Sequence, residues 1–180
     1  MMNKSILLMG TLLVSTFVEI AAQKNSENPN IIFVLADDMG IGDLGCYGQK
    51  KIKTPNIDKL AEKGVLFTNH YSGSTVSAPS RCSLLTGKHT GHAYIRGNKG
   101  IKSEEGFFDL HLPSDEVTVA EILKRKGYAT MCVGKWGLGG PHTTGSPVRK
   151  GFDYFFGYLS QGAAHRYYPE YLYENEDKVM

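Results

Sequence analysis

The sequence predicts an α/β fold with a mostly parallel sheet and helices on both of its faces. Strand-like and helix-like patterns alternate along the chain, which favours this architecture. Continuous apolar runs of strand length stand at 31–36 and 128–133. Such runs are typical of strands that are covered on both faces in a parallel sheet. The helices between them have clear start and stop residues.

The elements follow from local patterns. The helix at 55–63 is the best defined, because Thr54 can cap it, Pro55 suits its first turn and Gly64 ends it. A helix is also expected at 118–126, where the apolar residues are helix-spaced and Gly127 follows. The remaining expected elements are strands at 31–36, 65–71 and 128–133 and a helix at 79–86.

The first 23 residues are expected to be a secretory signal peptide. Lys4 precedes an apolar run, and the small residues Ala21 and Ala22 mark a cleavage region. The run is too short to span a bilayer comfortably, so we expect an exported, periplasmic or secreted protein without a stable membrane anchor. Residues 24–30 form a polar leader, and 31–180 form the folded part.

Composition narrows the function classes. The chain has 180 residues, and its 20 Lys and Arg nearly balance its 18 Asp and Glu, which gives no sign of a nucleic-acid surface. The three cysteines, Cys46, Cys82 and Cys132, lack C-x-x-C spacing, which argues against a zinc site. They are either small buried hydrophobes, or one pair forms a disulfide and leaves the third free.

The stretch 77–87 combines a hydroxyl group with groups that favour an anion. Ser77 stands just before the expected start of a helix, where free N–H groups and the helix dipole attract negative charge. Arg81 adds a permanently charged, fork-shaped donor. The pattern indicates a hydroxyl nucleophile beside an anion site, and the alternative is an ordinary helix start with Pro79 in its first turn.

Two further polar groups stand where apolar runs end. Asp37 and Asp38 follow the run 31–36, at the end of a strand where open α/β sheets bind ligands. Adjacent carboxylates suit a hard divalent cation, although a solvated acid pair is the common alternative. Lys135 follows the second run and stands beside Trp136, the single tryptophan.

These segments together resemble the sulfatase family. The stretch 77–81 matches its Ser-x-Pro-x-Arg motif and is followed by Thr-Gly, and 134–139 is similar to its Gly-Lys-Trp-His-Leu-Gly motif. The segments 37–45, 54–61 and 151–158 are also similar to the family, so the resemblance covers nearly all of 31–180. It implies an alkaline-phosphatase-like fold.

The resemblance also implies a set of site residues. It assigns a calcium ion to Asp37, Asp38 and residue 77, and the oxidation of Ser77 to formylglycine by a radical-SAM maturase. Arg81 would hold the formylglycine, and Lys135 would bind the sulfate group. The chain departs from the family at Gly137, where the motif has a histidine that contacts the sulfate.

Residues elsewhere are candidates for the rest of the site. His142 or His165 is a candidate to replace the missing histidine from another position. The candidates for contacts with the organic part of the substrate are Arg96, Asn98, His92 and His165, and the alternative is solvated loops and local packing.

The implied activity is hydrolysis of sulfate esters, with a sulfated small molecule or glycan as the substrate. The chain is expected to be an N-terminal fragment of the catalytic domain, with little activity alone, because sulfatases are longer and hold further ligands in their later part. One alternative is a phosphoesterase or phosphonate hydrolase of the same superfamily, which usually carries two zinc ions. Another is a non-catalytic relative that binds sulfated glycans, a reading that only Gly137 favours.

Overall fold

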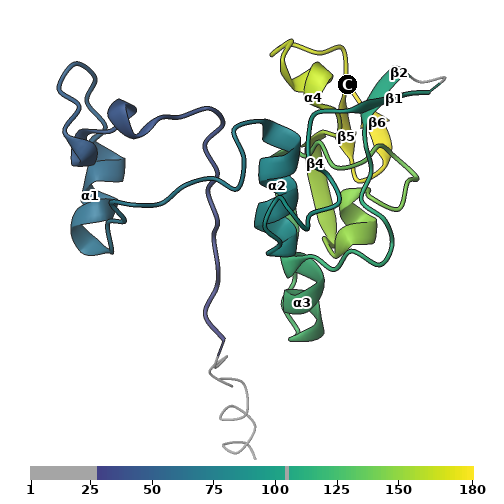
Figure 1. The fold of residues 1–180 in the computed structure, drawn as a ribbon, viewed down its shortest axis with the longest axis horizontal. Coiled ribbons are helices and arrows are strands. Elements are labelled where there is room, and N and C mark those ends of the chain that lie inside the picture. Colours follow the sequence, from purple (N-terminus) through teal and green to yellow (C-terminus); the bar gives the residue numbers. More distant parts are fainter. Residues whose placement is uncertain (1–27, 104–105) are drawn as a thin grey trace, which may run out of the picture. The chain divides into compact units, whose positions relative to one another are not determined.

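The computed structural model describes residues 28–103 and 106–180 (Figure 1). The chain divides into two compact units, Met1–Leu66 and Phe67–Met180. The expected signal peptide, 1–23, and most of the polar leader lie outside the described residues. Within the described part, no helix is long and apolar enough to cross a membrane.

From residue 28 onward, the first unit contains one α-helix, α1 (Pro55–Lys63), with the bounds that the sequence predicts, and two short 3-10 helices, η1 (Ile41–Asp43) and η2 (Gly45–Tyr47). The carboxylate of Asp58 joins α1 to η2. It accepts hydrogen bonds from the Cys46 N–H at 2.7 Å and from the Thr54 hydroxyl at 3.0 Å. This bonding orders the start of α1 against the preceding loop.

Two expected strands are not formed. Residues 31–36 have no regular secondary structure and are exposed, with Ile32 88% accessible, and residues 65–71 also lack a strand. An apolar run predicts that a segment is buried against something, but a parallel strand also needs a neighbouring strand to accept its backbone hydrogen bonds. In the described residues neither segment has such a neighbour.

The second unit holds the sheet. Its strands lie in the order β3 (Met131–Lys135), β4 (Tyr154–Tyr158), β5 (Leu172–Glu174) and β6 (Asp177–Val179). The β3–β4 pair is parallel, and the β4–β5 and β5–β6 pairs are antiparallel. A separate antiparallel hairpin is formed by β1 (Gly100–Ser103) and β2 (Gly106–Asp109). The predicted α/β class is confirmed, with a mixed sheet.

Three α-helices and one 3-10 helix accompany this sheet. They are α2 (Ser77–Thr86), α3 (Val119–Arg125), η3 (Pro147–Lys150) and α4 (Gln161–Ala164). Figure 1 shows α2 alongside the sheet, and its Ala78 and Cys82 belong to the same buried cluster as Phe155 of β4 and Tyr173 of β5. The burial of this face of α2 fixes the helix that begins at Ser77.

The loop before α3 is held by a buried lysine. Lys150 is 1% exposed, and its Nζ donates to the carbonyl oxygens of Pro113 at 2.6 Å, Glu116 at 2.8 Å and Ser114 at 3.3 Å. Thr118 caps α3 and donates its hydroxyl hydrogen to the Lys150 carbonyl at 2.7 Å. These bonds satisfy backbone carbonyls that would otherwise be buried without a partner.

Candidate functional site

Ser77 is the first residue of α2, two residues earlier than the sequence predicts for the helix start. Pro79 is accommodated because the first turn of a helix does not need its N–H groups for internal bonds. The residue before the helix, Val76, has no oxygen in its side chain to act as a cap. The Ala78 N–H instead donates to Asn98 Oδ1 at 3.1 Å, across 20 residues of sequence.

Arg81 connects Ser77 to the end of the sheet. Its Nε donates to Ser77 Oγ at 2.9 Å, one helical turn away, and its Nη1 donates to the Lys135 carbonyl oxygen at 2.6 Å. The planar guanidinium makes these bonds from two nitrogens held in a fixed geometry, which a flexible lysine ammonium does not offer. Three of the predicted site residues therefore form one connected group.

Lys135 is the last residue of β3 and pairs in parallel register with Tyr158 of β4. The segment after it is anchored by Trp136, which is 2% exposed and donates Nε1–H to the Gly145 carbonyl at 2.8 Å. The indole also meets the ring of Phe152 edge-on at 5.8 Å. The strand end that carries Lys135 is thus fixed by core packing.

At position 137, where the family motif has a histidine, the space beside the glycine is occupied by a side chain of α4. Gly137 has φ +76°, and a Cβ added there would overlap the side-chain amide of Gln161. His142 is occupied elsewhere, since its Nδ1 lies 3.2 Å from a Glu176 carboxylate oxygen and its side chain is 69% exposed. His165 is exposed and follows the last residue of α4.

Glu176 is the centre of a separate polar cluster. Burial raises the pKa of this carboxyl, but hydrogen bonds from the Ser146 hydroxyl, the His142 N–H and Arg149 outweigh burial and leave the pKa below its usual value. The Ser146 bond is 2.7 Å and the His142 N–H bond is 3.0 Å. This cluster ties the turn between β5 and β6 to the loop before η3.

The other predicted substrate contacts lie on the exposed loop after α2. Arg96 and His92 are exposed, and Arg96 Nε donates to the Ala93 carbonyl at 3.0 Å. Asn98 is the member of this group that the structure brings next to Ser77, through its bond to the second residue of α2. Contacts of these side chains with a substrate stay predictions.

Asp37 and Asp38 belong to the first unit and are exposed. Asp38 has φ +55°, an unusual backbone conformation for a residue other than glycine. Asp43 closes a turn by accepting from the Gly40 N–H at 2.7 Å.

The two carboxylates supply oxygen donors of the kind that calcium prefers. No three His, Cys, Asp or Glu side chains of the described residues gather into a group that could hold a metal ion. The donor chemistry of the two carboxylates therefore fits calcium.

The three cysteines carry free thiols, so the disulfide alternative is wrong. Cys82 is fully buried in the core cluster, and burial raises its pKa. Burial also raises the pKa of Cys132 to about 11. Cys46 is partly buried. The buried thiols have the character of small core residues, as predicted.

Comparison with known proteins decides the family. The family model described as "Sulfatase" matches residues 29–180. The chain belongs to the sulfatase family. An N-acetylgalactosamine-6-O-sulfatase of Bacteroides thetaiotaomicron is 48% identical over 142 residues, which are 74% of this chain and 27% of that protein. This sulfatase chain thus spans about a quarter of the length of that relative.

Solved structures agree with this assignment. A structure from a study of glycosaminoglycan metabolism by Bacteroides thetaiotaomicron has TM-score 0.71 and 42% identity, and covers 86% of this chain and 32% of its own. Another, solved in complex with its substrate D-glucosamine-2-N,6-O-disulfate, has TM-score 0.63 and 32% identity, with 84% and 27% covered. The alkaline-phosphatase-like α/β fold that the sequence implied is confirmed.

Two polar residues near the group around Ser77 have contacts that the sequence did not predict. The bond from Ala78 to Asn98 was missed, although a helix start without a capping side chain signals that an acceptor must come from elsewhere. Gln161 was missed entirely, and the single signal for it was the glycine at 137.

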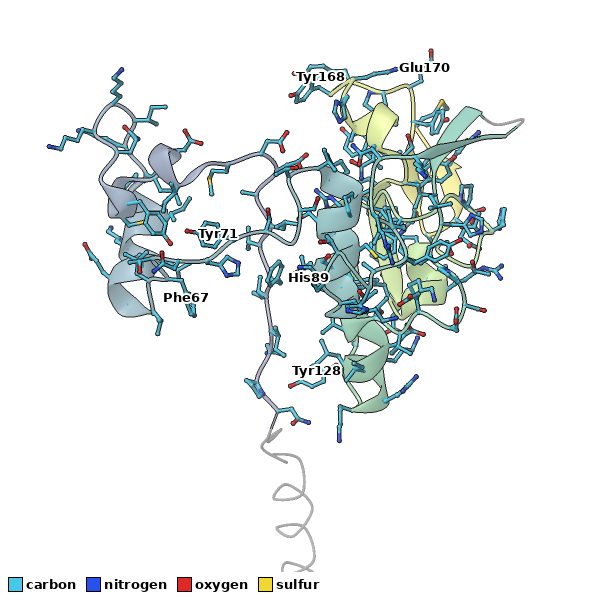
Figure 2. The ribbon with its side chains drawn as sticks, viewed as in Figure 1. Phe67, Tyr71, His89, Tyr128, Tyr168 and Glu170 are labelled. Atoms are coloured by element: carbon cyan, nitrogen blue, oxygen red, sulfur yellow. The ribbon has the colours of Figure 1, made fainter. Side chains whose placement is uncertain are left out.

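Figure 2 shows Tyr168 and Glu170 extending outward from the segment after α4, and Tyr168 is 96% exposed.

Proposed function

We propose that the full-length sulfatase hydrolyses sulfate esters of sulfated carbohydrates through a formylglycine made from Ser77. The observation that carries the proposal is the position of Arg81, which donates both to Ser77 Oγ and to the Lys135 carbonyl. A hydroxyl-bearing residue at a helix N-terminus, hydrogen-bonded to an arginine, suits an oxyanion substrate.

The proposed chemistry depends on oxidation of Ser77. Converting its hydroxymethyl group to an aldehyde removes two hydrogen atoms, that is two protons and two electrons, and a radical-SAM maturase would accept the electrons. The hydrated aldehyde would supply two hydroxyls on one carbon, one for attack on sulfur and one whose deprotonation would release the sulfate after the alcohol has left. A plain serine lacks the second hydroxyl and would be left sulfated.

The residues of this chain would divide the remaining work. Arg81 would orient the oxygen of residue 77 and offset negative charge on it. Lys135 would hold the sulfate oxygens as negative charge moves to the leaving group. Asp37 and Asp38 would hold one calcium ion, and calcium would supply charge that makes an oxygen ligand more acidic.

Sulfated amino sugars are the proposed substrate class. One relative is an N-acetylgalactosamine-6-O-sulfatase, and one similar structure holds a sulfated glucosamine as its substrate. The exposed polar residues Arg96, His92 and His165 would contact the sugar. Export to the periplasm or the medium is proposed from the expected signal peptide at 1–23.

The test is co-expression of the full-length protein with a serine-type maturase. Mass spectrometry of the peptide that contains Ser77 should show the loss of two hydrogen atoms and reactivity with an aldehyde reagent. The matured protein should release sulfate from N-acetylgalactosamine 6-sulfate, and Ser77→Ala should abolish this release. Sulfate release by a protein that keeps an unmodified serine at 77 would contradict the proposal, as would hydrolysis of phosphate esters alone.

A further inference from the structure

The segment after α4 contains a strained three-residue turn centred on Tyr167. The φ angle of Tyr167 is +59°, a value that residues other than glycine rarely adopt. The Tyr168 N–H donates to the Arg166 carbonyl at 2.7 Å, so the turn closes over a single residue. A γ-turn with positive φ is rare and strained. Such strain persists only where surrounding contacts hold it, and it is concentrated at functional sites.

The phenol of Tyr158 supplies such a contact. Its hydroxyl donates to the Tyr167 carbonyl at 3.1 Å. On the other side, the Tyr167 N–H donates to the carbonyl of Ala164, the last residue of α4, at 3.3 Å. The strained turn is therefore tied both to the end of β4 and to the end of α4.

Tyr158 also stands next to the predicted sulfate-binding residue. It is the last residue of β4 and the parallel register partner of Lys135, the last residue of β3. Neighbouring strands lie about 5 Å apart, so the backbones of these two residues are adjacent. Both strands end at the same edge of the sheet, where open α/β sheets bind ligands. Tyr158 thus connects the turn at Tyr167 to the strand end that carries Lys135.

The turn presents the ring of Tyr168 to solvent. This side chain is 96% exposed, and Figure 2 shows it extending outward from the segment after α4. Pro169 follows, and a residue before proline is restricted to extended backbone conformations. The backbone of Tyr168 is therefore restrained on both sides, by the closed turn and by the proline. A ligand that binds the ring has little backbone entropy left to remove.

The neighbours of Tyr168 are polar. His165, Arg166 and Glu170 are exposed, and the exposed large apolar side chains of the segment 165–171 are Tyr167 and Tyr168 alone. A protein interface is marked by a broader apolar patch than this. A sugar ring fits better, because its apolar C–H face matches an aromatic ring and its hydroxyl and anionic groups match the polar side chains around it.

We propose that Tyr168 stacks on the sugar ring of the substrate while Lys135 holds the sulfate group, and that Tyr158 is the positioning residue for Tyr168. This inference rests on the proposed sulfatase activity and adds to it a residue that recognises the organic part of the ester. Tyr168 recognises the ring and not the sulfate. The affinity for free sulfate therefore does not depend on it.

The first experiment separates binding of the sugar from binding of sulfate. Calorimetry is carried out on the full-length protein with Ser77→Ala, which prevents turnover, and the probes are N-acetylgalactosamine 6-sulfate and inorganic sulfate. Adding Tyr168→Ala should weaken binding of the sulfated sugar roughly three- to tenfold and leave the affinity for inorganic sulfate unchanged. Tyr168→Phe keeps the ring and should bind both probes as the parent does. Equal affinity of the alanine variant and the parent for the sugar would overturn the proposal.

The second experiment tests the positioning role of Tyr158. Tyr158→Phe removes the hydroxyl that holds the turn and should weaken sugar binding about two- to fivefold. Combined with Tyr168→Ala it should cause no further loss, because it acts through Tyr168. The matched control is Tyr154→Phe in the same strand, which removes a hydroxyl that donates to Glu174 at 2.9 Å and should leave sugar binding unchanged. Additive losses from Tyr158→Phe and Tyr168→Ala would refute the positioning role.

The outcomes separate this inference from the proposed function. If the matured wild type cleaves sulfate esters but Tyr168→Ala binds the sulfated sugar as the parent does, the inference is overturned and the proposed function stands. If Tyr168→Ala weakens binding of inorganic sulfate as much as binding of the sugar, the residue shapes the sulfate site and the stacking role is overturned. If the matured wild type neither binds nor cleaves sulfate compounds, both fall.

Discussion

Replacing Arg81 by lysine tests the connection between Ser77 and the end of β3. Lysine keeps the positive charge but has a single nitrogen. It lacks the two nitrogens in fixed positions from which Arg81 donates to Ser77 Oγ at 2.9 Å through Nε and to the Lys135 carbonyl at 2.6 Å through Nη1. We therefore expect at least one of the two hydrogen bonds to be lost or lengthened in this variant.

The size of the effect follows from the bond that is lost. A hydrogen bond to a charged group contributes about 1.5–3 kcal/mol. If the lost bond acts in the transition state, kcat/KM should fall by roughly 10- to 150-fold. Because the Lys135 carbonyl is the more distant partner in sequence, loss of its bond should also loosen the contact between α2 and β3.

The assay is steady-state hydrolysis of 4-nitrophenyl sulfate by the matured full-length protein. Mass spectrometry must first show that residue 77 is oxidised to the same extent in both proteins. Arg149→Lys is the matched control, since Arg149 donates to the separate Glu176 cluster at 3.3 Å and is half exposed. This control should stay within about twofold of the wild type, because an exposed pair contributes little. Arg81→Lys with unchanged kcat/KM would refute the proposed role of the guanidinium.

Three further predictions concern single side chains. Lys150→Met should lower the free energy of unfolding by about 2–4 kcal/mol, because three backbone carbonyls lose their donor. The control Lys126→Met, on the surface, should change the free energy of unfolding little. Denaturant titration measures both variants. Asn98→Ala should lower kcat/KM several-fold, because the Ala78 N–H loses its acceptor. Asn98→Asp keeps an acceptor and should retain activity. A loss of activity in both variants would indicate that the amide NH₂ matters instead. A hydrogen bond from Lys124, and then those from the N–H and hydroxyl of Thr130, lower the pKa of the Asp153 carboxyl to about 2. The ionised carboxylate therefore stabilises the fold fully above about pH 4, and this stabilisation is lost as pH falls towards 2. Asp153→Asn should flatten the acid limb of a plot of Tm against pH over that range, and an unchanged limb would contradict this assignment.

The sequence predicted α1 correctly because its boundaries are local. Thr54, Pro55 and Gly64 specify the start and the end within a dozen residues, and no distant contact is needed. The expected strand at 31–36 was wrong for the opposite reason. Its apolar residues record a tendency to be buried, but strand formation depends on a hydrogen-bonding neighbour that the run itself does not specify.

The sequence by itself determined the family and the chemical types of the candidate site. The motifs around Ser77 and Lys135 can be recognised from order and spacing alone, and the four-residue spacing of Ser77 and Arg81 puts them on one face of a helix. The tertiary structure alone decided that Arg81 reaches the Lys135 carbonyl, that Asn98 accepts from the start of α2, and that Gln161 fills the space beside Gly137. These contacts join residues far apart in sequence, and local patterns do not specify the path by which the chain brings such residues together.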